Sequence, residues 1–335
     1  MNEKNEKLNP SRQEKIFFIV GRGRSGTWLL QSILDHHPQI CVAPEAVFML
    51  TLYRKYRRIK HWTDKKNESL IKDLGEINRV NKWLKLDWIK FRKMLSELPS
   101  NSSFEERCKL VYKNYAEKMG KKNLSLLGDK MPTYSLFLEE LCEIIPQAIF
   151  IHMIRDPRDT VISYKKVHFD LNNTVVLAQR WCVYNRYILS FKQKNPQRFI
   201  TLKYEDFLHN PEKQLRRLCV FMNLPYDTRM LEFHKKPRNI LVWNEDIASP
   251  IQIQKAYKWN HHMERNEAKL VDYTCRGLAE KFGYEVSDHK IPFYLKIWVK
   301  LGKLVGWISI KLERGCFRLP FRLQVKIVNK LDPLL

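Results

Sequence analysis

Short apolar runs recur along the chain, and each ends at glycine, proline or charged residues. The first run, Lys15–Val20, is apolar at five of its six positions and rich in β-branched residues, so it predicts a buried strand. Similar runs predict strands at residues 39–43, 147–154 and 199–202, and the apolar segment 121–127 predicts a fifth. The chain is therefore expected to build its core on a sheet.

Segments with apolar residues at helical spacing lie between these strands. Residues 27–34 give the first helix an apolar face, and residues 134–145, closed by Pro146, predict another helix. Strands that alternate with helices predict an α/β fold with a mainly parallel sheet flanked by helices. In such sheets ligands bind beyond the carboxyl ends of the strands, where the polar motifs of this chain are expected to lie.

The remaining segments define the domain organisation. Residues 1–14 are polar and charged, so we expect a disordered arm and no signal peptide there. Residues 15–288 are expected to form the main domain. Within it, residues 46–123 alternate basic, aromatic and aliphatic positions at helical spacing, with breaks near Asp64 and at residues 99–101, and predict a helical insertion. Residues 289–335 form a separate basic extension.

The chain carries a large excess of positive charge: 60 Lys and Arg stand against 36 Asp and Glu, a formal net charge of +24. This excess implies acidic partners such as nucleic acid, anionic lipid, a polyanionic glycan or a phosphorylated cofactor. The seven cysteines lack C-x-x-C spacing, which favours reduced thiols in a reducing compartment over disulfides or a zinc site. No apolar run is long enough to predict a membrane-spanning helix.

A glycine-rich loop, G-R-G-R-S-G-T at residues 21–27, joins the first strand to the first helix. Its glycines allow the backbone N–H groups to approach a ligand, and the helix N-terminus favours negative charge. Arg22 and Arg24 add two permanent cations. The pattern predicts a site for a phosphate or a similar anion, and the alternative is a tight turn that binds nothing.

This loop differs from that of the nucleoside triphosphatases. Gly21 and Gly26 have the correct separation, but Thr27 and Trp28 stand where that motif requires Lys and then Ser or Thr. The lysine that contacts the outer phosphates and the hydroxyl that binds magnesium are therefore missing. A nucleotide kinase that uses the same loop is kept as an alternative function.

A second strand-to-helix junction begins at Arg155. Asp156 is suited to cap the following helix and Pro157 to occupy its first position. Arg155 and Ser163, eight residues apart, are expected to converge on one phosphate. The alternative is a capped helix whose charges are solvated.

Together these motifs resemble those of the sulfotransferases, above all protein-tyrosine sulfotransferases and the bacterial enzymes like them. The loop, followed by a helix that ends in Asp-His-His-Pro, resembles the family's 5′-phosphosulfate loop, and the Arg155 segment resembles its 3′-phosphate motif. The resemblance covers roughly residues 15–285. It implies a P-loop NTPase-like fold and 3′-phosphoadenosine 5′-phosphosulfate (PAPS) as donor. The implied donor-binding residues are Arg22, Gly23, Arg24, Ser25, Gly26, Thr27, Trp28, Arg155 and Ser163.

Glu45 lies 21 residues after Arg24, where the resemblance implies the catalytic base. An attacking hydroxyl must lose its proton, and a carboxylate within hydrogen-bond distance can accept it. The alternative is an exposed carboxylate with no role. Other branches of the family use a histidine, but His36 and His37 are expected to cap carbonyl groups at the end of the first helix.

Lys130, in the sequence G-D-K-M-P, matches a family lysine followed by proline two residues later. Its ammonium is expected to stabilise the charge that develops on the oxygen between sulfur and the 5′-phosphate, with help from Arg24. The alternative is an ordinary surface lysine. Tyr204 matches the aromatic residue beside adenine, and Lys258 belongs to a Lys-Trp pair that closes over the donor. Asn244 replaces a donor-binding serine of the family, which weakens that contact.

The extension lies outside the resemblance. Between residues 291 and 330, basic residues recur every three to four positions with aromatic and aliphatic residues between them, and Pro320 is expected to divide the segment into two helices. This pattern is typical of a helix that lies in a membrane interface. The alternative is a pair of helices packed on the core with a solvated basic edge.

The leading hypothesis is a sulfotransferase that moves a sulfuryl group from PAPS to a hydroxyl of a glycan, a lipid or sterol, or a tyrosine. Positioning and electrostatics suffice for this reaction, so no metal is expected. We expect a cytoplasmic protein that associates with the anionic inner membrane surface through residues 291–330. A non-catalytic basic protein that binds nucleic acid or membrane is the alternative from another class, although no nucleic-acid motif is recognised.

Overall fold

The computed structural model describes residues 14–167, 170–235, 249–287 and 290–331 of the chain. The arm predicted over residues 1–14 therefore lies outside the described residues, except for Glu14, and so does Asn244.

Five parallel strands form the predicted sheet, in the order β2-β3-β1-β4-β5. The strands are β1 (Lys15–Val20), β2 (Ile40–Ala43), β3 (Leu126–Lys130), β4 (Ile149–Ile154) and β5 (Phe199–Lys203). In the central strand, Phe17 pairs with Gly128 on one side and with Ile149 on the other. A Cβ at Gly128 would overlap the Phe17 ring, so this glycine lets an aromatic side chain lie across the neighbouring strand.

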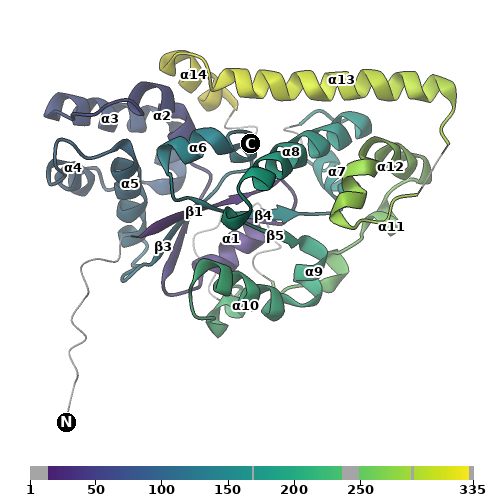
Figure 1. Cartoon of the computed structure of the whole chain (residues 1–335), viewed down its shortest axis with the longest axis horizontal. Helices are drawn as coiled ribbons and strands as arrows, with labels where there is room; N and C mark the ends of the chain where they lie inside the picture. The colour runs from purple at the N-terminus through teal and green to yellow at the C-terminus, as the bar shows by residue number, and fades with distance from the viewer. Residues whose placement is uncertain (1–13, 168–169, 236–248, 288–289, 332–335) are drawn as a thin grey trace, which may run out of the picture.

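Helices cover both faces of this sheet (Figure 1). Successive residues of β1 point to opposite faces: Phe17 and Ile19 join one buried cluster, while Phe18 and Val20 join another. The first cluster includes side chains of α1 (Thr27–Asp35), α9 (Tyr204–His209) and α10 (Pro211–Met222). The second includes side chains of α2 (Phe48–Tyr56), α5 (Phe104–Lys118), α6 (Leu138–Ile144) and α8 (Thr174–Lys194). A parallel sheet buried on both faces by helices confirms the α/β prediction.

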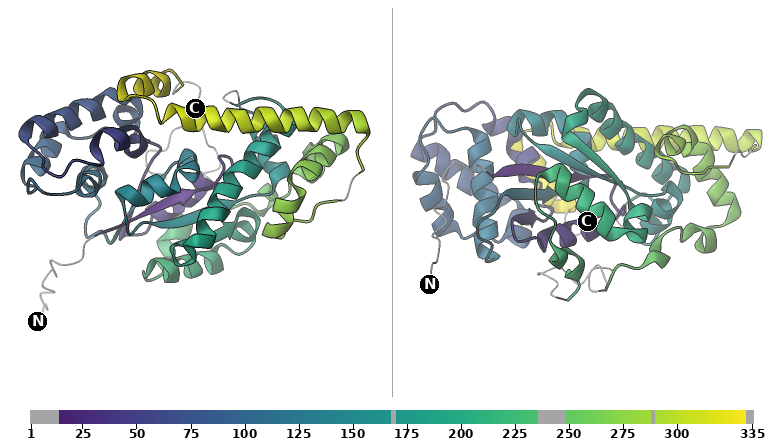
Figure 2. Two further views of the ribbon diagram at one scale, coloured as in Figure 1. Left: turned by 45° about the horizontal axis from the view of Figure 1, so that its top comes forward. Right: turned by 60° about the horizontal axis from the view of Figure 1, so that its bottom comes forward.

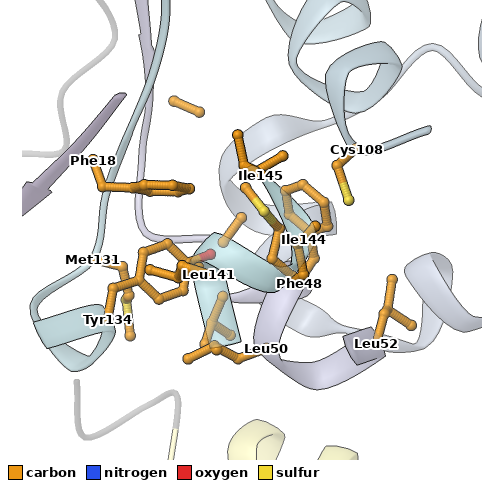
Figure 3. Close-up of a cluster of buried hydrophobic side chains, with 14 of the residues drawn as sticks. Phe18, Phe48, Leu50, Leu52, Cys108, Met131, Tyr134, Leu141, Ile144 and Ile145 are labelled. Atoms are coloured by element: carbon orange, nitrogen blue, oxygen red, sulfur yellow. The ribbon is translucent and has the colours of Figure 1, made fainter. Parts of the chain in front are cut away.

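Figure 3 shows part of the second cluster, which includes Phe18 of β1 together with side chains from α2, α5 and α6. Here the helix predicted over residues 134–145 is divided into a 3-10 turn, η2 (Pro132–Leu136), and the helix α6. Phe137, with φ of −138°, separates them. The break turns Tyr134 edge-on against Phe18, with ring centroids 5.5 Å apart. It also brings Ser135 to the backbone of Gly21.

The segment between β2 and β3 is helical, as the predicted insertion requires. It consists of α2, α3 (Asp64–Glu76), the π-helix η1 (Val80–Leu84), α4 (Trp88–Ser96) and α5. Thr63 caps α3, and Ser103 forms a capping box with Glu106 at the start of α5. These caps follow the breaks predicted near Asp64 and at residues 99–101.

The remaining helices lie at the second junction and in the extension. They are α7 (Pro157–Lys165), α11 (Trp259–His262), α12 (Arg265–Ala279), α13 (Phe293–Cys316) and α14 (Phe321–Leu331). Four short 3-10 turns complete the described elements: η3 (Pro196–Arg198), η4 (Thr228–Glu232), η6 (Ile253–Lys255) and η7 (Glu280–Phe282). The extension breaks at Pro320 as predicted, and α13 runs along α8 at one side of the molecule (Figures 1 and 2).

Candidate functional site

The carboxyl ends of the five parallel strands meet at one edge of the sheet, and each carries a residue singled out in the sequence. Gly21 follows β1, Glu45 lies two residues beyond β2, and Lys130 ends β3. Arg155 follows β4, and Tyr204 follows β5. The parallel topology thus gathers residues that lie up to 183 positions apart in the sequence.

The glycine-rich loop is held against the sheet by contacts that require glycine at two positions. Gly21 has φ of 146°, and a Cβ there would overlap the carbonyl oxygen of Met153 on β4. Its N–H donates to Ser135 Oγ at 2.9 Å. Gly26 has φ of 90°, and a Cβ there would overlap the ring of Tyr204. The loop backbone therefore lies directly beside β4 and Tyr204.

The glycine-rich loop between β1 and α1 and the Arg155 segment between β4 and α7, here called the two corners, are in contact. Arg24 Nε donates to Ser163 Oγ on α7 at 3.0 Å, and Arg155 Nη1 donates to the carbonyl oxygen of Arg24 at 3.4 Å. The Arg155 guanidinium lies 4.5 Å from the centroid of the Tyr204 ring. Arg24, Arg155, Ser163 and Tyr204 thus form one contiguous surface between the loop and α7.

A late segment of the chain closes the second corner. Arg155 Nη2 donates to Asp159 Oδ2 at 3.1 Å and to the carbonyl oxygen of Lys255 at 2.9 Å. The Trp259 N–H donates to Asp159 Oδ1 at 2.8 Å. Lys258, the residue before α11, therefore lies in a segment that is held near Arg155 through Lys255 on one side and Trp259 on the other.

Arg22 takes a position that the sequence did not suggest. Its buried guanidinium is paired with Asp170 and lies over the rings of Tyr164 and Tyr184, at 4.0 and 4.9 Å from their centroids. A Cβ at the adjacent Gly23 would overlap the Tyr164 hydroxyl. Arg22 therefore anchors the loop to the helices beneath it, while Arg24 remains at the corner.

The rest of the loop presents polar groups that suit an anionic ligand. Ser25 is buried, and its Oγ has no hydrogen-bond partner among the described residues. Arg155 Nε is likewise buried without a partner in the described part of the chain. Thr27 is buried at the first position of α1, whose N-terminus faces the loop. Buried polar atoms without partners are costly, and a bound phosphate or sulfate oxygen would satisfy them.

Lys130, which is buried at the end of β3, forms an ion pair with the partly exposed Glu45 just beyond β2. The Lys130 ammonium lies over the Trp28 ring, 3.3 Å from its centroid, so the tryptophan of α1 covers it. Burial lowers the pKa of Lys130 to about 8, although the paired Glu45 acts in the opposite direction. The charge of Lys130 thus depends on its immediate neighbours. Because its side chain is fully buried, Lys130 is not an ordinary surface lysine.

Arg79 is a site residue that the sequence reasoning missed. It lies between α3 and η1 in the helical insertion, and its side chain is buried. Its Nη1 lies 3.5 Å from the Glu45 carboxylate, and donates to the Glu45 carbonyl oxygen at 3.4 Å. The insertion therefore holds Glu45 through both its carboxylate and its backbone carbonyl. Nothing in the sequence distinguishes this arginine from the many other basic residues of the insertion.

Asp129, the neighbour of Lys130, was also missed as a titratable group. It is fully buried, and its Oδ2 accepts hydrogen bonds from Tyr112 at 2.6 Å and from Tyr134 at 3.0 Å. Burial raises the pKa of Asp129 to about 7, against the opposing effects of the two hydroxyls and of Lys130. A protonatable carboxyl therefore lies directly behind the Glu45–Lys130 pair.

The raised pKa of Asp129 predicts a pH-dependent stability. Between about pH 4 and pH 7 the native protein holds a proton on Asp129 that the unfolded chain releases. The free energy of unfolding should therefore fall by a few kcal/mol as the pH rises through this window. Asp129→Asn should remove that slope in urea titrations at several pH values, while Asp64→Asn, at an exposed helix start, should not. An unchanged slope in Asp129→Asn would contradict the prediction.

No three His, Cys, Asp or Glu side chains gather as metal ligands within the described ranges. All seven cysteines carry free thiols.

Sequence comparisons give a consistent set of similarities. A profile of the Sulfotransferase family matches residues 17–228. A protein-tyrosine sulfotransferase of Drosophila melanogaster is 25% identical over 268 residues, covering 74% of this chain and 48% of the fly protein. A putative protein-tyrosine sulfotransferase of Caenorhabditis briggsae is 26% identical over 294 residues, covering 84% and 92% of the two chains. An omega-hydroxy-beta-dihydromenaquinone-9 sulfotransferase of Mycobacterium bovis is 34% identical over 108 residues, 28% of each chain.

The fold has a similar set of solved neighbours. The sulfotransferase domain of the Synechococcus PCC 7002 olefin synthase matches with a TM-score of 0.57 and 22% identity, covering 84% of this chain and 99% of that domain. A sulfotransferase domain from the curacin biosynthetic pathway matches with a TM-score of 0.56. These likenesses confirm the predicted P-loop-like α/β fold. The chain spans about half the length of the fly relative.

Proposed function

The chain belongs to the sulfotransferase family, and from this premise we propose that it transfers a sulfuryl group from PAPS to the hydroxyl of an acceptor. The observation that carries the proposal is the contact between the two corners, through Arg24 with Ser163 and Arg155 with Arg24. One ligand with phosphate groups at both ends of a nucleoside would bridge such a surface.

The residues at the two corners would bind different parts of the donor. The loop N–H groups, Ser25 and the N-terminus of α1 would hold the 5′-phosphosulfate. Arg155 and Ser163 would hold the 3′-phosphate, and the unpaired Ser25 Oγ and Arg155 Nε are polar atoms that the donor would satisfy. Tyr204 would stack near adenine, with Lys258 closing from the late segment.

The ion pair of Glu45 and Lys130 supports the proposed chemistry. Glu45 would take the proton of the acceptor hydroxyl while its oxygen forms a bond to sulfur. The bond from sulfur to the bridging oxygen breaks, and adenosine 3′,5′-bisphosphate leaves with the negative charge. Lys130, with Arg24, would stabilise that charge as it grows. The donor also offers Lys130 a second anionic partner, which would release the Glu45 carboxylate for the acceptor.

The acceptor is proposed at the level of a hydroxyl-bearing molecule: a tyrosine, a lipid or sterol, or a glycan. Relatives named for tyrosine and for an omega-hydroxylated menaquinone support this class. We propose a cytoplasmic location, no resident metal and no nucleic-acid partner. A nucleotide kinase is the rival function, and Thr27 and Trp28 at the two diagnostic loop positions argue against it.

Thermal unfolding tests the donor site directly. Adenosine 3′,5′-bisphosphate at 100 times its Kd should stabilise the protein by about 2.7 kcal/mol, whereas ATP with magnesium at the same concentration should stabilise it much less. Arg155→Ala should weaken adenosine 3′,5′-bisphosphate roughly 10- to 100-fold through the loss of a charged hydrogen bond, and affect adenosine 5′-phosphate little.

The matched control is Arg216→Ala, an exposed arginine paired with Glu212 on α10, which should leave both ligands unchanged. Equal stabilisation by ATP with magnesium would favour the kinase. No stabilisation by adenosine 3′,5′-bisphosphate would overturn the proposed donor.

A further inference from the structure

Helix α13 packs on α8 through one narrow side. Val299 and Ile310 are buried on this side, and two glycines bring the helix backbones close together. A Cβ at Gly302 would lie 2.7 Å from a Val175 side-chain atom, and one at Gly306 would lie 3.0 Å from Gln179. The inner side of α13 is therefore fixed, and its remaining two sides face outward.

One outward side is apolar. Successive residues of an α-helix are rotated by about 100°, so positions three and four apart share a side. Large side chains at such positions are exposed along the helix, among them Trp298 at 67%, Leu304 at 52% and Leu312 at 70%. We call this the apolar side of α13; it comprises Tyr294, Ile297, Trp298, Leu301, Leu304, Val305, Ile308 and Leu312.

The other outward side is basic. Lys296, Lys300, Lys303 and Lys311 repeat at helical spacing and fall between the apolar side and the side packed on α8. Glu313 is the only acidic residue of Phe293–Cys316, and it points inward: it accepts hydrogen bonds from Tyr184 at 2.6 Å and from Arg180 at 2.9 Å. The outward surface of α13 therefore combines a continuous apolar strip with a row of lysines that no outward acid of α13 opposes.

We propose that this outward surface docks on an anionic membrane, with the apolar side in the boundary between headgroups and acyl chains and the lysines on the headgroups. Charge complementarity carries the choice of partner, because the chain has a net charge of +24 and α13 presents no outward acid. Exposed Trp and Tyr side chains favour the interfacial region. No helix among the described residues is long and apolar enough to cross a membrane, so α13 lies on the surface.

Charge also argues against a second copy of the chain as the occupant. Two copies that met through their apolar sides would bring their lysine rows close together, and like charges opposed across an interface are unfavourable. An anionic lipid surface satisfies both outward sides at once. The proposal concerns binding alone, so it stands or falls independently of the donor and acceptor proposed above.

Vesicle co-sedimentation of the full chain tests the proposal. The protein should sediment with vesicles of phosphatidylcholine and phosphatidylserine, and at least tenfold less with phosphatidylcholine alone at the same ionic strength. The double variant Trp298→Glu and Leu312→Glu should lose at least tenfold in binding. The matched control is Ile89→Glu with Val220→Glu, at exposed apolar positions of α4 and α10 (84% and 80%), which changes the net charge equally and should retain binding.

Three single variants test the basic side separately from the apolar side. Lys296, Lys300 and Lys303 lie outside the apolar side, and replacing any one of them by alanine should weaken binding to the anionic vesicles roughly fivefold. Circular dichroism and the melting temperature establish that each variant is folded. Absence of binding to anionic vesicles, or equal loss in the Ile89 and Val220 control, would overturn the proposal. So would sedimentation velocity showing a dimer that the Trp298 and Leu312 variant dissociates, since the surface would then join two copies.

Discussion

Glu45→Gln is expected to lower kcat by about 10²- to 10⁴-fold, the usual contribution of a general base. Glutamine keeps the size of the side chain and can still accept a hydrogen bond from Arg79, but it cannot take the proton of the acceptor hydroxyl. Binding of adenosine 3′,5′-bisphosphate should remain nearly unchanged, because the donor contacts come from the two corners. Sulfuryl transfer from radiolabelled PAPS and calorimetric binding of the desulfated product measure the two quantities separately.

The matched control for this substitution is Glu143→Gln, an exposed glutamate that pairs with Arg57 and Tyr53 far from the loop. Full activity in Glu45→Gln would show that another group takes the proton. The two histidines that follow α1 are poor substitutes. His36 Nδ1 lies 2.7 Å from the carbonyl oxygen of Ser32 in the last turn of α1, as expected for a capping group. His37 does not cap α1 as expected: its Nε2 lies 2.9 Å from the carbonyl oxygen of Pro225, and its Nδ1 accepts from the Gln39 N–H.

Lys130→Met is expected to reduce kcat by about 10²- to 10³-fold, because it removes a preorganised cation that stabilises the negative charge on the leaving group. The same lysine sets a pH limit for the wild type. Burial lowers the pKa of Lys130 to about 8, so its charge is lost as the pH rises through that value. Because kcat/KM reports the free enzyme, it should fall up to tenfold per pH unit above about 8.

Lys130→Arg provides the matching test, because a guanidinium keeps its charge throughout this range. Its kcat/KM should be lower than that of the wild type but should lack the alkaline fall. The pH dependence of the free energy of unfolding tests the same pKa independently. Between about pH 8 and pH 10.5 the unfolded chain binds the lysine proton and the native protein does not. The free energy of unfolding should therefore rise with pH over this window in the wild type and stay flatter in Lys130→Met. A kcat/KM that remains constant to pH 10 would contradict the assignment.

The arrangement of the strands was accessible from the sequence because it follows from one rule. Ala43 and Asp129 are paired in register on neighbouring parallel strands, so the residues just beyond them must come together. Glu45 and Lys130 therefore meet although 85 residues separate them. The same rule brought Arg155 to the glycine-rich loop.

The contacts made by the helical insertion could not be predicted in the same way. Whether Arg79 reaches Glu45 depends on how α3 and η1 pack, and periodicity gives the side of a helix but not its neighbour. The pairing of Arg22 with Asp170 was hidden for a similar reason, since it depends on where the segment before α8 folds back. Among 60 basic residues, composition alone cannot distinguish a buried cation from a solvated one.

The structure also explains why the loop differs from that of the nucleoside triphosphatases. Where nucleoside triphosphatases have the phosphate-binding Lys and then a hydroxyl, this chain has Thr27 and Trp28. The Trp28 ring covers the ammonium of Lys130, so the cation reaches the site from β3 instead of from the loop. The indole shields that cation from water on one side and thereby strengthens its interactions with bound anions.

The inward face of α13 has a consequence for how this protein should be shortened. Glu313 accepts a hydrogen bond from Thr133, three residues after Lys130, and pairs with Arg180, which in turn lies 3.3 Å from Asp170, the partner of Arg22. Cutting the chain before residue 291 would remove the carboxylate at the end of this row and alter the charge balance beneath the glycine-rich loop. A truncated enzyme would therefore lose affinity for its donor even if the missing helices served only as an anchor.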